Sequence, residues 1–319
     1  MNPHIGQSDV ASYAASTVNL DAEHARKHRA QVNALRERLA AKISDDPEFS
    51  LVKMLHSGSV AKGTALSTLS DMDVAVYVRK ASAPTDPADL LNWLAERLRE
   101  ANPQLNPDQF YLGTHCVSIN FRGSGLNVDM VPVLDADDKD DRGYLLNRDT
   151  GQWLETSIPL HLEFIRTRKT LRPVHFAQTI RLIKWWAAQQ KAMRTGFRFK
   201  SFLIELLCAH LLDNGADMSN YPVALEEFFA YIIKSGLQET IAFADYARRA
   251  PGGSAAPIRV FDPVNLDNNV AENYSDADRR LIIDAAYDAL DALTEAHHSD
   301  TKGRATLRWK EVLGPSFRP

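Results

Sequence analysis

The stretch HSGSVAKGTALSTLSDMDVAVYV, residues 56–78, decides the fold. It places Gly58 and Ser59 after a short apolar segment, and it places Asp71 and Asp73 at the head of an apolar run. The length of that run and its β-branched residues predict a strand. Because residues two apart on a strand point to the same side, the two aspartates project together, while the apolar residues that alternate with them face a core.

The composition is that of a globular protein of ordinary charge. The chain has 319 residues, of which 45% are hydrophobic and 24% charged, and its net charge is −4. Such a chain is long enough for one large domain or two lobes. Proteins that coat long nucleic acid have a basic surface, which this charge balance does not predict. We therefore expect no long nucleic acid as a partner.

Neither the cysteines nor the apolar segments point to a zinc site, a disulfide framework or a membrane. Cys116 and Cys208 stand in apolar runs without C-x-x-C or paired Cys/His spacing, so we expect two buried, reduced thiols. The N-terminal sequence MNPHIGQSDVASYAAS lacks the charged and apolar regions of a secretory signal. No window has the apolar length of a membrane span. We expect a cytoplasmic protein with no membrane partner.

The pattern along the chain predicts an α/β plus α organisation. The predicted strands are 51–57, 71–78, 115–123 and 125–134, the last two joined as a hairpin through Gly123-Ser124-Gly125. The predicted helices are 20–45, 88–100, 173–194, 201–213, 224–237 and 275–296. We assign 1–160 to a catalytic sheet lobe with a long N-terminal helix and 161–319 to a helical lobe, with the active site in the cleft between them.

A third carboxylate completes the pair at the head of the predicted strand. Two carboxylates ~6–7 Å apart on one strand face repel each other unless a positive charge lies between them. The segment NVDMVPV supplies Asp129, whose apolar neighbours should face the core and leave it on the open face. Two Mg²⁺ ions ~3.5–4 Å apart fit such a gap, and Mn²⁺ can substitute. Asp71, Asp73 and Asp129 are the predicted metal ligands, although aspartates at strand ends are also common turn and cap residues.

Gly58 and Ser59 follow a short strand at a place suited to phosphate. Glycine lets the backbone approach a ligand closely, and exposed N–H groups at such a place can hold phosphate oxygens. The segment GSVAKGT is not a P-loop, because Lys62 precedes the second glycine instead of following it. The phosphate contact is therefore assigned to the Gly-Ser pair itself.

The order Gly-Ser, eleven residues, Asp-x-Asp and a later single Asp resembles the DNA-polymerase-β-like nucleotidyltransferase superfamily. The resemblance implies that Gly58 and Ser59 hold the β- and γ-phosphates of a nucleoside triphosphate. It also implies that Asp71 and Asp73 bind both metal ions. Asp129, by the same resemblance, binds one ion and helps to activate the attacking hydroxyl.

A basic segment lies in the predicted helical lobe. Residues 161–200 contain ten Lys or Arg against one acid. A solvated helix face explains many of them, but substrate phosphates would also supply the counter-charge. The segments IRLIKWW and KSFLIELL resemble the helical lobe of oligoadenylate synthase-like enzymes, which implies that Lys184 and Ser201 contact the triphosphate. Ser201 also begins a predicted helix, and helix N-termini favour anions.

Two later segments resemble the same enzymes. VFDPVNLDNNVA, residues 260–271, resembles their D-P-x-x-P/L-x-x-N segment near the active-site mouth. This implies that Asp262 and Asn269 face the nucleotide, and a plain Asx and proline loop is an equal alternative. The C-terminal WKEVLGPSF resembles a W-x-x-x-F-G-x-x-F ending, with Leu313 in place of the usual Phe.

On these motifs the chain is identified as a member of the bacterial cGAS/DncV-like nucleotidyltransferases. The resemblance implies an enzyme that joins nucleoside triphosphates, ATP among them, into a cyclic di- or trinucleotide second messenger. Pyrophosphate leaves, and the product is an anti-phage alarm. The sequence has no zinc-binding insertion of the animal DNA-sensing type. The resemblance therefore points to regulation by a protein, for instance a HORMA-like partner, and not by DNA.

Other functions remain open on the sequence alone. The same chemistry could add a nucleoside monophosphate to a tRNA, a protein or a small molecule. A catalytically inactive nucleotide-binding scaffold is the alternative outside enzymes, and the presence of all three aspartates argues against it. A calcium site in the acidic segment 135–143 is disfavoured, because Lys139 or Arg142 falls on a ligand position.

Overall fold

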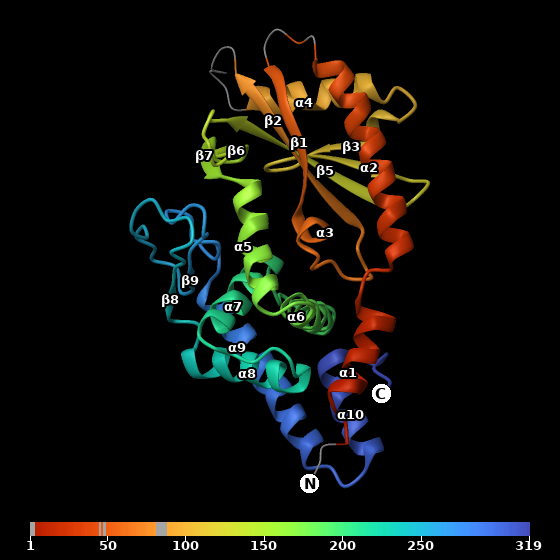
Figure 1. Cartoon of the computed structure of the whole chain (residues 1–319), viewed down its shortest axis with the longest axis vertical. Helices are drawn as coiled ribbons and strands as arrows, with labels where there is room; N and C mark the ends of the chain where they lie inside the picture. Colours follow the sequence, from red (N-terminus) through yellow and green to blue (C-terminus); the bar gives the residue numbers. More distant parts are fainter. Residues whose placement is uncertain (1–3, 45, 47–48, 81–87) are drawn as a thin grey trace. The chain divides into compact units, whose positions relative to one another are not determined.

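The computed structural model describes residues 4–44, 46, 49–80 and 88–319. The chain divides into two compact units, Leu20–Glu163 and the pair of segments Met1–Asn19 and Phe164–Pro319. Each unit is described by itself, with the element labels of Figure 1. Within the described ranges, every helix is too short or too polar to cross a membrane.

The first unit, Leu20–Glu163, is built on a mixed sheet. The described residues form seven strands: β1 Phe49–Ser57, β2 Asp71–Lys80, β3 Phe110–Leu112, β4 Val117–Phe121, β5 Leu126–Asp135, β6 Gly143–Asn147 and β7 Gln152–Thr156. Their order is β1-β2-β5-β4-β3, with β6 paired to β5 and β7 to β6. β2 and β5 run parallel, whereas the other described pairs are antiparallel. The sheet therefore places β2 beside β5, as Figure 1 shows.

Two helices cover one face of this sheet. The helices of the unit are α2 Ala22–Ile43, α3 Gly58–Lys62 and α4 Ala88–Ala101, with a short 3₁₀ turn, η2, at Pro107–Gln109. Asp21 caps α2, since its side chain accepts hydrogen bonds from the N–H groups of Glu23 and His24. The apolar faces of α2 and α4 share one core with the residues of β2 that alternate with the aspartates, Met72, Val74, Val76 and Val78. The predicted facing of β2 is confirmed.

The opposite face of β2 is apolar at its far end. Ala75 and Tyr77 form a second small core with Val133. The Tyr77 hydroxyl donates to the carbonyl oxygen of Asp141 and accepts from the N–H of Ile158, both at 3.1 Å. Burial raises the pKa of Tyr77 to about 12. The accessible part of this face therefore lies at the beginning of β2.

The second unit is mainly helical. Its elements are α1 Gln7–Tyr13, the π-helical turn η1 Ala14–Val18, α6 His175–Met193, α7 Ser201–Asp213, α8 Tyr221–Ser235, α9 Asp276–His297, α10 Lys302–Leu313 and the strand pair β8 Thr240–Ile241 with β9 Arg259–Val260. Helix α5, Ile158–Leu171, begins in the first unit and continues into this one. Ser275 caps α9 through a capping box with Asp278.

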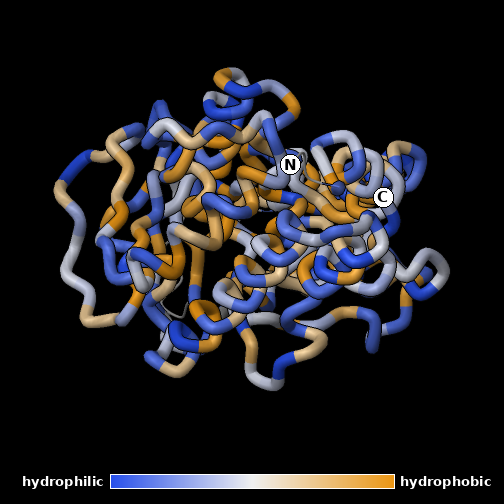
Figure 2. Tube along the Cα trace, turned by 90° about the horizontal axis from the view of Figure 1, so that it is seen from below, coloured by the Kyte–Doolittle hydropathy of each residue, from blue (hydrophilic) through white to orange (hydrophobic). Residues whose placement is uncertain are grey.

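Hydrophobic and hydrophilic residues alternate along much of the trace, as the colours of Figure 2 show. This alternation is expected of elements that bury one face and expose the other. Helix α7 differs, because every residue from Leu203 to Ala209 is buried, as is every residue of β2 from Val74 to Val78. All strands and helices predicted from the sequence are present, and α1, β3, β6, β7, α5, β8, β9 and α10 are additional.

Candidate active site

The three predicted aspartates lie on two neighbouring strands. Asp73 on β2 pairs with Asp129 on β5, and Asp71 pairs with Asn127 two residues earlier on the two strands. Paired residues of adjacent strands lie about 4.8 Å apart in the sheet. The acid at position 129 is therefore beside the two acids of β2, although Asp73 and Asp129 are more than fifty residues apart in the sequence.

Two rows of polar side chains cross the sheet from β4 to β2 and include the three acids. In the first row, Asn120 on β4 donates from its amide to the side-chain oxygen of Asn127 at 2.7 Å. Asn127 in turn donates to Asp71 Oδ1 at 3.0 Å. In the second row, the hydroxyl of Ser118 on β4 donates to Asp129 Oδ1 at 2.5 Å. Both rows therefore end on predicted metal ligands.

Gly58 packs directly against the carboxylate of Asp73. Its φ is +65°, and a Cβ at this position would lie 1.7 Å from Asp73 Oδ2. Glycine alone tolerates both the positive φ and this close approach. Gly58 and Ser59 begin α3, immediately after Ser57, whose Cα is the β1 partner of Asp73. The predicted Gly-Ser pair and the second aspartate are therefore neighbours.

The donor chemistry of the three aspartates fits a hard divalent cation. They offer oxygen ligands only, and the lack of a side chain at Gly58 makes room for the Asp73 carboxylate itself. Within the residues that the structure describes, however, no three His, Cys, Asp or Glu side chains are arranged to hold a metal ion. Metal binding by Asp71, Asp73 and Asp129 stays a prediction, based on strand register.

A thiol lies beside the second polar row. Cys116 is half-buried, and its Sγ lies 3.6 Å from the hydroxyl oxygen of Ser118. Burial, together with the nearby carboxylates of Asp129 and Asp73, raises the pKa of the Cys116 thiol, which is protonated at neutral pH. Cys208 is buried in α7. Both cysteines are free, as predicted, but the prediction that both are buried is wrong for Cys116.

The residues predicted to contact the triphosphate from the helical lobe belong to the second unit. Ser201 is exposed in the first turn of α7, directly after the N-cap residue Lys200. Lys184 on α6 is only 5% exposed, and its ammonium donates to Oε1 of Glu205 at 2.6 Å. Glu205, on α7, is 2% exposed. The Lys184 charge is therefore compensated by a carboxylate of the chain itself.

Other members of the basic segment 161–200 also find acids within the chain. Arg168 is buried and forms ion pairs with both Asp213 and Asp245. Arg194 on α6 forms an ion pair with Asp288 on α9. Substrate phosphates are therefore not required as the counter-charge of these arginines.

The side chains of Asp262 and Asn269 form hydrogen bonds with the backbone of their own loop. Asp262 Oδ1 accepts from the N–H of Val264 at 2.8 Å. The Asn269 side chain accepts from the N–H of Val260 at 3.1 Å and donates to the carbonyl oxygen of Ile258 at 2.9 Å. Both side chains are almost fully buried. These contacts favour the Asx and proline loop, which the sequence left as an equal alternative.

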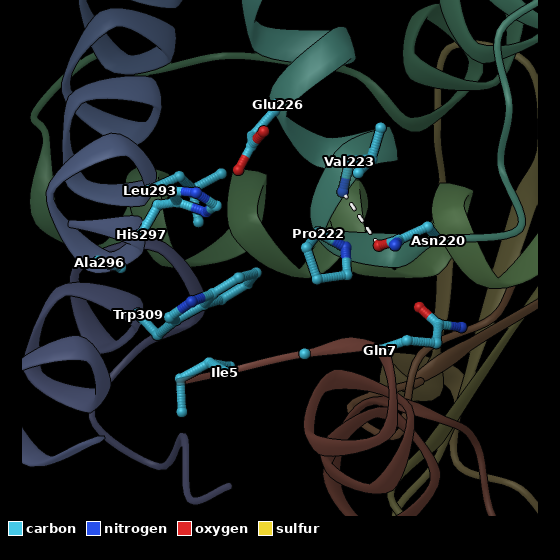
Figure 3. A pocket seen from close by; sticks show the side chains of 11 residues that line it. Ile5, Gln7, Asn220, Pro222, Val223, Glu226, Leu293, Ala296, His297 and Trp309 are labelled. Carbon is cyan, nitrogen blue, oxygen red and sulfur yellow. Dashed lines mark hydrogen bonds between the residues drawn. The ribbon is translucent and has the colours of Figure 1, made fainter. Parts of the chain in front are cut away.

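A separate pocket of about 130 Å³ lies in the second unit, and Figure 3 shows its lining. The carboxylate of Glu226 and the ring of His297 lie on its walls above the indole of Trp309. Burial raises the pKa of Glu226. None of the site residues predicted from the sequence is among the residues that line this pocket.

Three residues of the polar rows were not predicted from the sequence as site residues: Ser118, Asn120 and Asn127. The signal that could have found two of them is the alternation in HCVSINF, where Cys116, Ser118 and Asn120 are polar or small and the residues between them are apolar. The core contains Val117 and the apolar residues that follow it at every second position. A strand of this pattern presents one polar face.

The sequence matches a known family model over half of its length. The Second Messenger Oligonucleotide or Dinucleotide Synthetase domain matches residues 7–168. A cyclic AMP-AMP-AMP synthase of Escherichia coli (strain MS 115-1) is 48% identical over 316 residues, which are 99% of this chain and 98% of the relative. A CBASS oligonucleotide cyclase, CdnC, of E. coli (strain KTE188) is 30% identical over 317 residues, 98% of this chain and 97% of that protein.

Among the solved structures that match the fold over nearly the whole chain are two of a relative. The structure of E. coli MS115-1 CdnC with ATP has a TM-score of 0.90 at 48% identity, and the match covers 99% of this chain and 100% of that one. The complex of E. coli MS115-1 CdnC with HORMA-deltaN has a TM-score of 0.89 at 47% identity, with 99% of each chain covered.

Proposed function

The chain belongs to the Second Messenger Oligonucleotide or Dinucleotide Synthetase family of bacterial nucleotidyltransferases, and we propose that it joins ATP into a cyclic triadenylate. It is a cyclic oligonucleotide synthase of anti-phage signalling, and pyrophosphate is the second product of each joining step. The choice of adenine and of three units is supported by 48% identity, over 99% of the chain, to a cyclic AMP-AMP-AMP synthase.

The chemistry belongs to Asp71, Asp73 and Asp129. The observation that carries this assignment is the pairing of Asp73 with Asp129 on adjacent parallel strands, with Asp71 two residues away on the same face. We propose that these carboxylates hold two Mg²⁺ ions, for which Mn²⁺ can substitute. When bound, such ions lower the pKa of an attacking hydroxyl and neutralise charge on the triphosphate.

The remaining residues bind and orient the nucleotide. Gly58 and Ser59 contact the terminal phosphates beside Asp73, and Ser201 offers a hydroxyl from the exposed first turn of α7. Lys184 reaches a phosphate only when its ion pair with Glu205 opens. A ribose hydroxyl of one nucleotide then attacks the α-phosphorus of the next in line, and pyrophosphate leaves. Positioning and charge neutralisation lower the barrier.

A HORMA-like protein is the regulatory partner that we propose, since a CdnC relative at 47% identity forms a complex with HORMA-deltaN. We place the reaction in the cytoplasm, where its nucleoside triphosphate substrates are made. Binding of the partner and synthesis of the product can be tested separately. A complex with a HORMA-like protein can be measured by gel filtration without any nucleotide, and product formation can be measured with and without that protein.

Labelled ATP tests the proposed reaction. The protein is incubated with labelled ATP and Mg²⁺, with a HORMA-like partner present or absent, and the mixture is then treated with phosphatase. We expect a phosphatase-resistant product with the mass of a cyclic triadenylate, and none from CTP or UTP alone. If the label becomes resistant to phosphatase only when a tRNA, a protein or a small-molecule acceptor is added, the enzyme instead transfers a nucleoside monophosphate to that acceptor.

A further inference from the structure

We propose that Ser118 and Asn127 are positioning residues, which fix the carboxylates of Asp129 and Asp71 so that each presents one oxygen to a divalent cation. This inference rests on the proposed function, because it concerns the same three aspartates. Neither residue belongs to the motifs that identify the family, and neither needs to touch nucleotide or metal. Their proposed action is exerted through the carboxylates alone.

The hydrogen bond from Ser118 engages only one of the two carboxylate oxygens of Asp129. The two residues are direct partners in the antiparallel pairing of β4 with β5, so their side chains stand together on one face. The hydroxyl donates to Oδ1 at 2.5 Å, a short distance typical of a hydroxyl bound to a charged oxygen. Oδ2 of Asp129 has no hydrogen-bond partner in the described part of the chain. One oxygen is held, and the other is available.

Asn127 likewise donates to only one carboxylate oxygen of Asp71, and the Asn127 side chain in turn accepts from Asn120. An ionised carboxylate only accepts hydrogen bonds, so Asn127 must turn its NH₂ group toward Asp71. Asn120 donates to the side-chain oxygen of Asn127 at 2.7 Å, which agrees with the orientation that the carboxylate requires. Oδ2 of Asp71, like that of Asp129, accepts no hydrogen bond from the residues described.

Neutral donors are the suitable chemistry for this task. A lysine or arginine bound to these carboxylates would neutralise them and compete with the cation. No such ion pair to Asp71 or Asp129 occurs among the residues whose placement is described. A hydroxyl and an amide restrict the rotation of the carboxylates and leave their charge in place. Outer hydrogen bonds of this kind orient metal ligands, and their removal typically costs 10–100-fold in metal affinity or activity.

The test compares Ser118→Val with Ser118→Thr, two variants of equal size on a strand. Mn²⁺ binding to the full-length, nucleotide-free protein is measured from the electron paramagnetic resonance signal of unbound Mn²⁺. We expect Ser118→Val to bind Mn²⁺ about 10- to 100-fold more weakly than wild type, and Ser118→Thr, which keeps the hydroxyl, to bind within about twofold of wild type. Asn127→Ala should resemble the valine variant.

Ser124→Ala is the matched control, because Ser124 lies in the hairpin between β4 and β5 and its hydroxyl contacts Gln31 and Phe121, not an aspartate. It should bind Mn²⁺ as wild type does. Asp129→Asn separates the two proposals. If Asp129→Asn loses Mn²⁺ binding while Ser118→Val keeps it, the positioning role is wrong and the metal site stands. If Asp129→Asn also binds Mn²⁺ as wild type does, the metal site itself is wrong.

A second readout excludes a merely structural role. The Mg²⁺ concentration for half-maximal pyrophosphate release should rise by a similar 10- to 100-fold in Ser118→Val, with a melting temperature close to that of Ser118→Thr. Equal loss in the valine and threonine variants, in step with a lower melting temperature, would mean that the residue only packs the sheet. That result would overturn the proposal.

Discussion

At Gly58 the backbone must adopt a positive φ and also leave room for a carboxylate. Its φ is +65°, and the space where a Cβ would stand is within 1.7 Å of Asp73 Oδ2. Gly125 has a nearly equal φ of +69°, but nothing lies within 4 Å of the corresponding Cβ position. The two glycines therefore separate the cost of backbone strain from the cost of displacing the Asp73 carboxylate.

Gly58→Ala and Gly125→Ala should both destabilise the fold by about 1–2 kcal/mol, since a left-handed φ is sterically strained for alanine at each position. Only Gly58→Ala should lose product formation, because its Cβ forces the Asp73 side chain to move. Urea unfolding measures the first effect, and pyrophosphate release at saturating ATP measures the second. Equal activity of the two variants would contradict the close packing of Gly58 on the candidate site.

Tyr77 makes the stability of the sheet unit depend on pH in the alkaline range. Burial raises its pKa from 10.0 to about 12. As pH rises, the unfolded chain therefore loses this proton before the folded chain does. The stability that Tyr77 contributes is fully present below pH 10 and falls between pH 10 and 12, by up to about 2.7 kcal/mol. We expect the urea midpoint of wild type to fall more between pH 9 and 11.5 than that of Tyr77→Phe.

The phenylalanine variant also reports the hydrogen bonds of Tyr77. At pH 9 it should be less stable than wild type by about 1–3 kcal/mol, because the N–H of Ile158 loses its acceptor. The other tyrosines titrate in both proteins and cancel in the comparison. Parallel loss of stability in the two proteins from pH 9 to 11.5 would rule out the Tyr77 contribution.

At the scale of elements, strong periodicity made the prediction possible. The alternation in β2 and the helical spacing in α2 allowed both to be located from the sequence, and the Asp71, Asp73 and Asp129 assignment followed from that alternation. Strands β3, β6 and β7 are only three to five residues long, so little pattern marks them. Their pairing partners, and not local propensity, define them. The partnership of β2 with β5 likewise depends on the sheet as a whole.

Helices α6 and α7 are joined by the buried ion pair of Lys184 with Glu205. A family resemblance alone assigns Lys184 to the triphosphate, and no local pattern could reveal its acidic partner one helix away. Lys184→Met should therefore destabilise the helical unit by about 3–5 kcal/mol, because it leaves a buried carboxylate without its counter-ion. Its loss of activity would not, by itself, identify a nucleotide contact.

The double variant Lys184→Met with Glu205→Leu separates structure from binding. Removal of both charges should restore most of the lost stability, since the buried carboxylate is gone as well. Thermal unfolding checks this, and ATP affinity is then measured on the double variant. ATP affinity equal to that of wild type would show that Lys184 serves packing. A large loss of affinity in a stable double variant would assign it to the nucleotide.

At the scale of the molecule, contacts between the two ends of the chain shape the helical unit. The Tyr13 hydroxyl donates to the carbonyl oxygen of Leu313, and the ring packs against Phe317 and Trp185. Met1–Asn19 therefore clusters with Phe164–Pro319. A boundary drawn along the sequence cannot anticipate contacts between residues 300 positions apart.

The predicted site residues are divided between the two units. The three aspartates and the Gly-Ser pair, which would carry the chemistry, all belong to the sheet unit. Lys184, Ser201, Asp262 and Asn269 belong to the helical unit, and three of these four side chains are buried. Alternation within β2 and within β5 indicates the face that carries Asp71, Asp73 and Asp129, which is why the sequence could predict these residues, whereas the pairing of the two strands is a property of the sheet.

Pyrophosphate release by Asp73→Asn tests the central claim most directly. The substitution removes one negative charge beside Gly58 and Asp129 and keeps the size of the side chain. With Mg²⁺ and ATP, we predict that this variant releases no measurable pyrophosphate while its melting temperature stays close to that of wild type. Release at the wild-type rate would contradict the assignment of the three aspartates to metal-dependent nucleotidyl transfer.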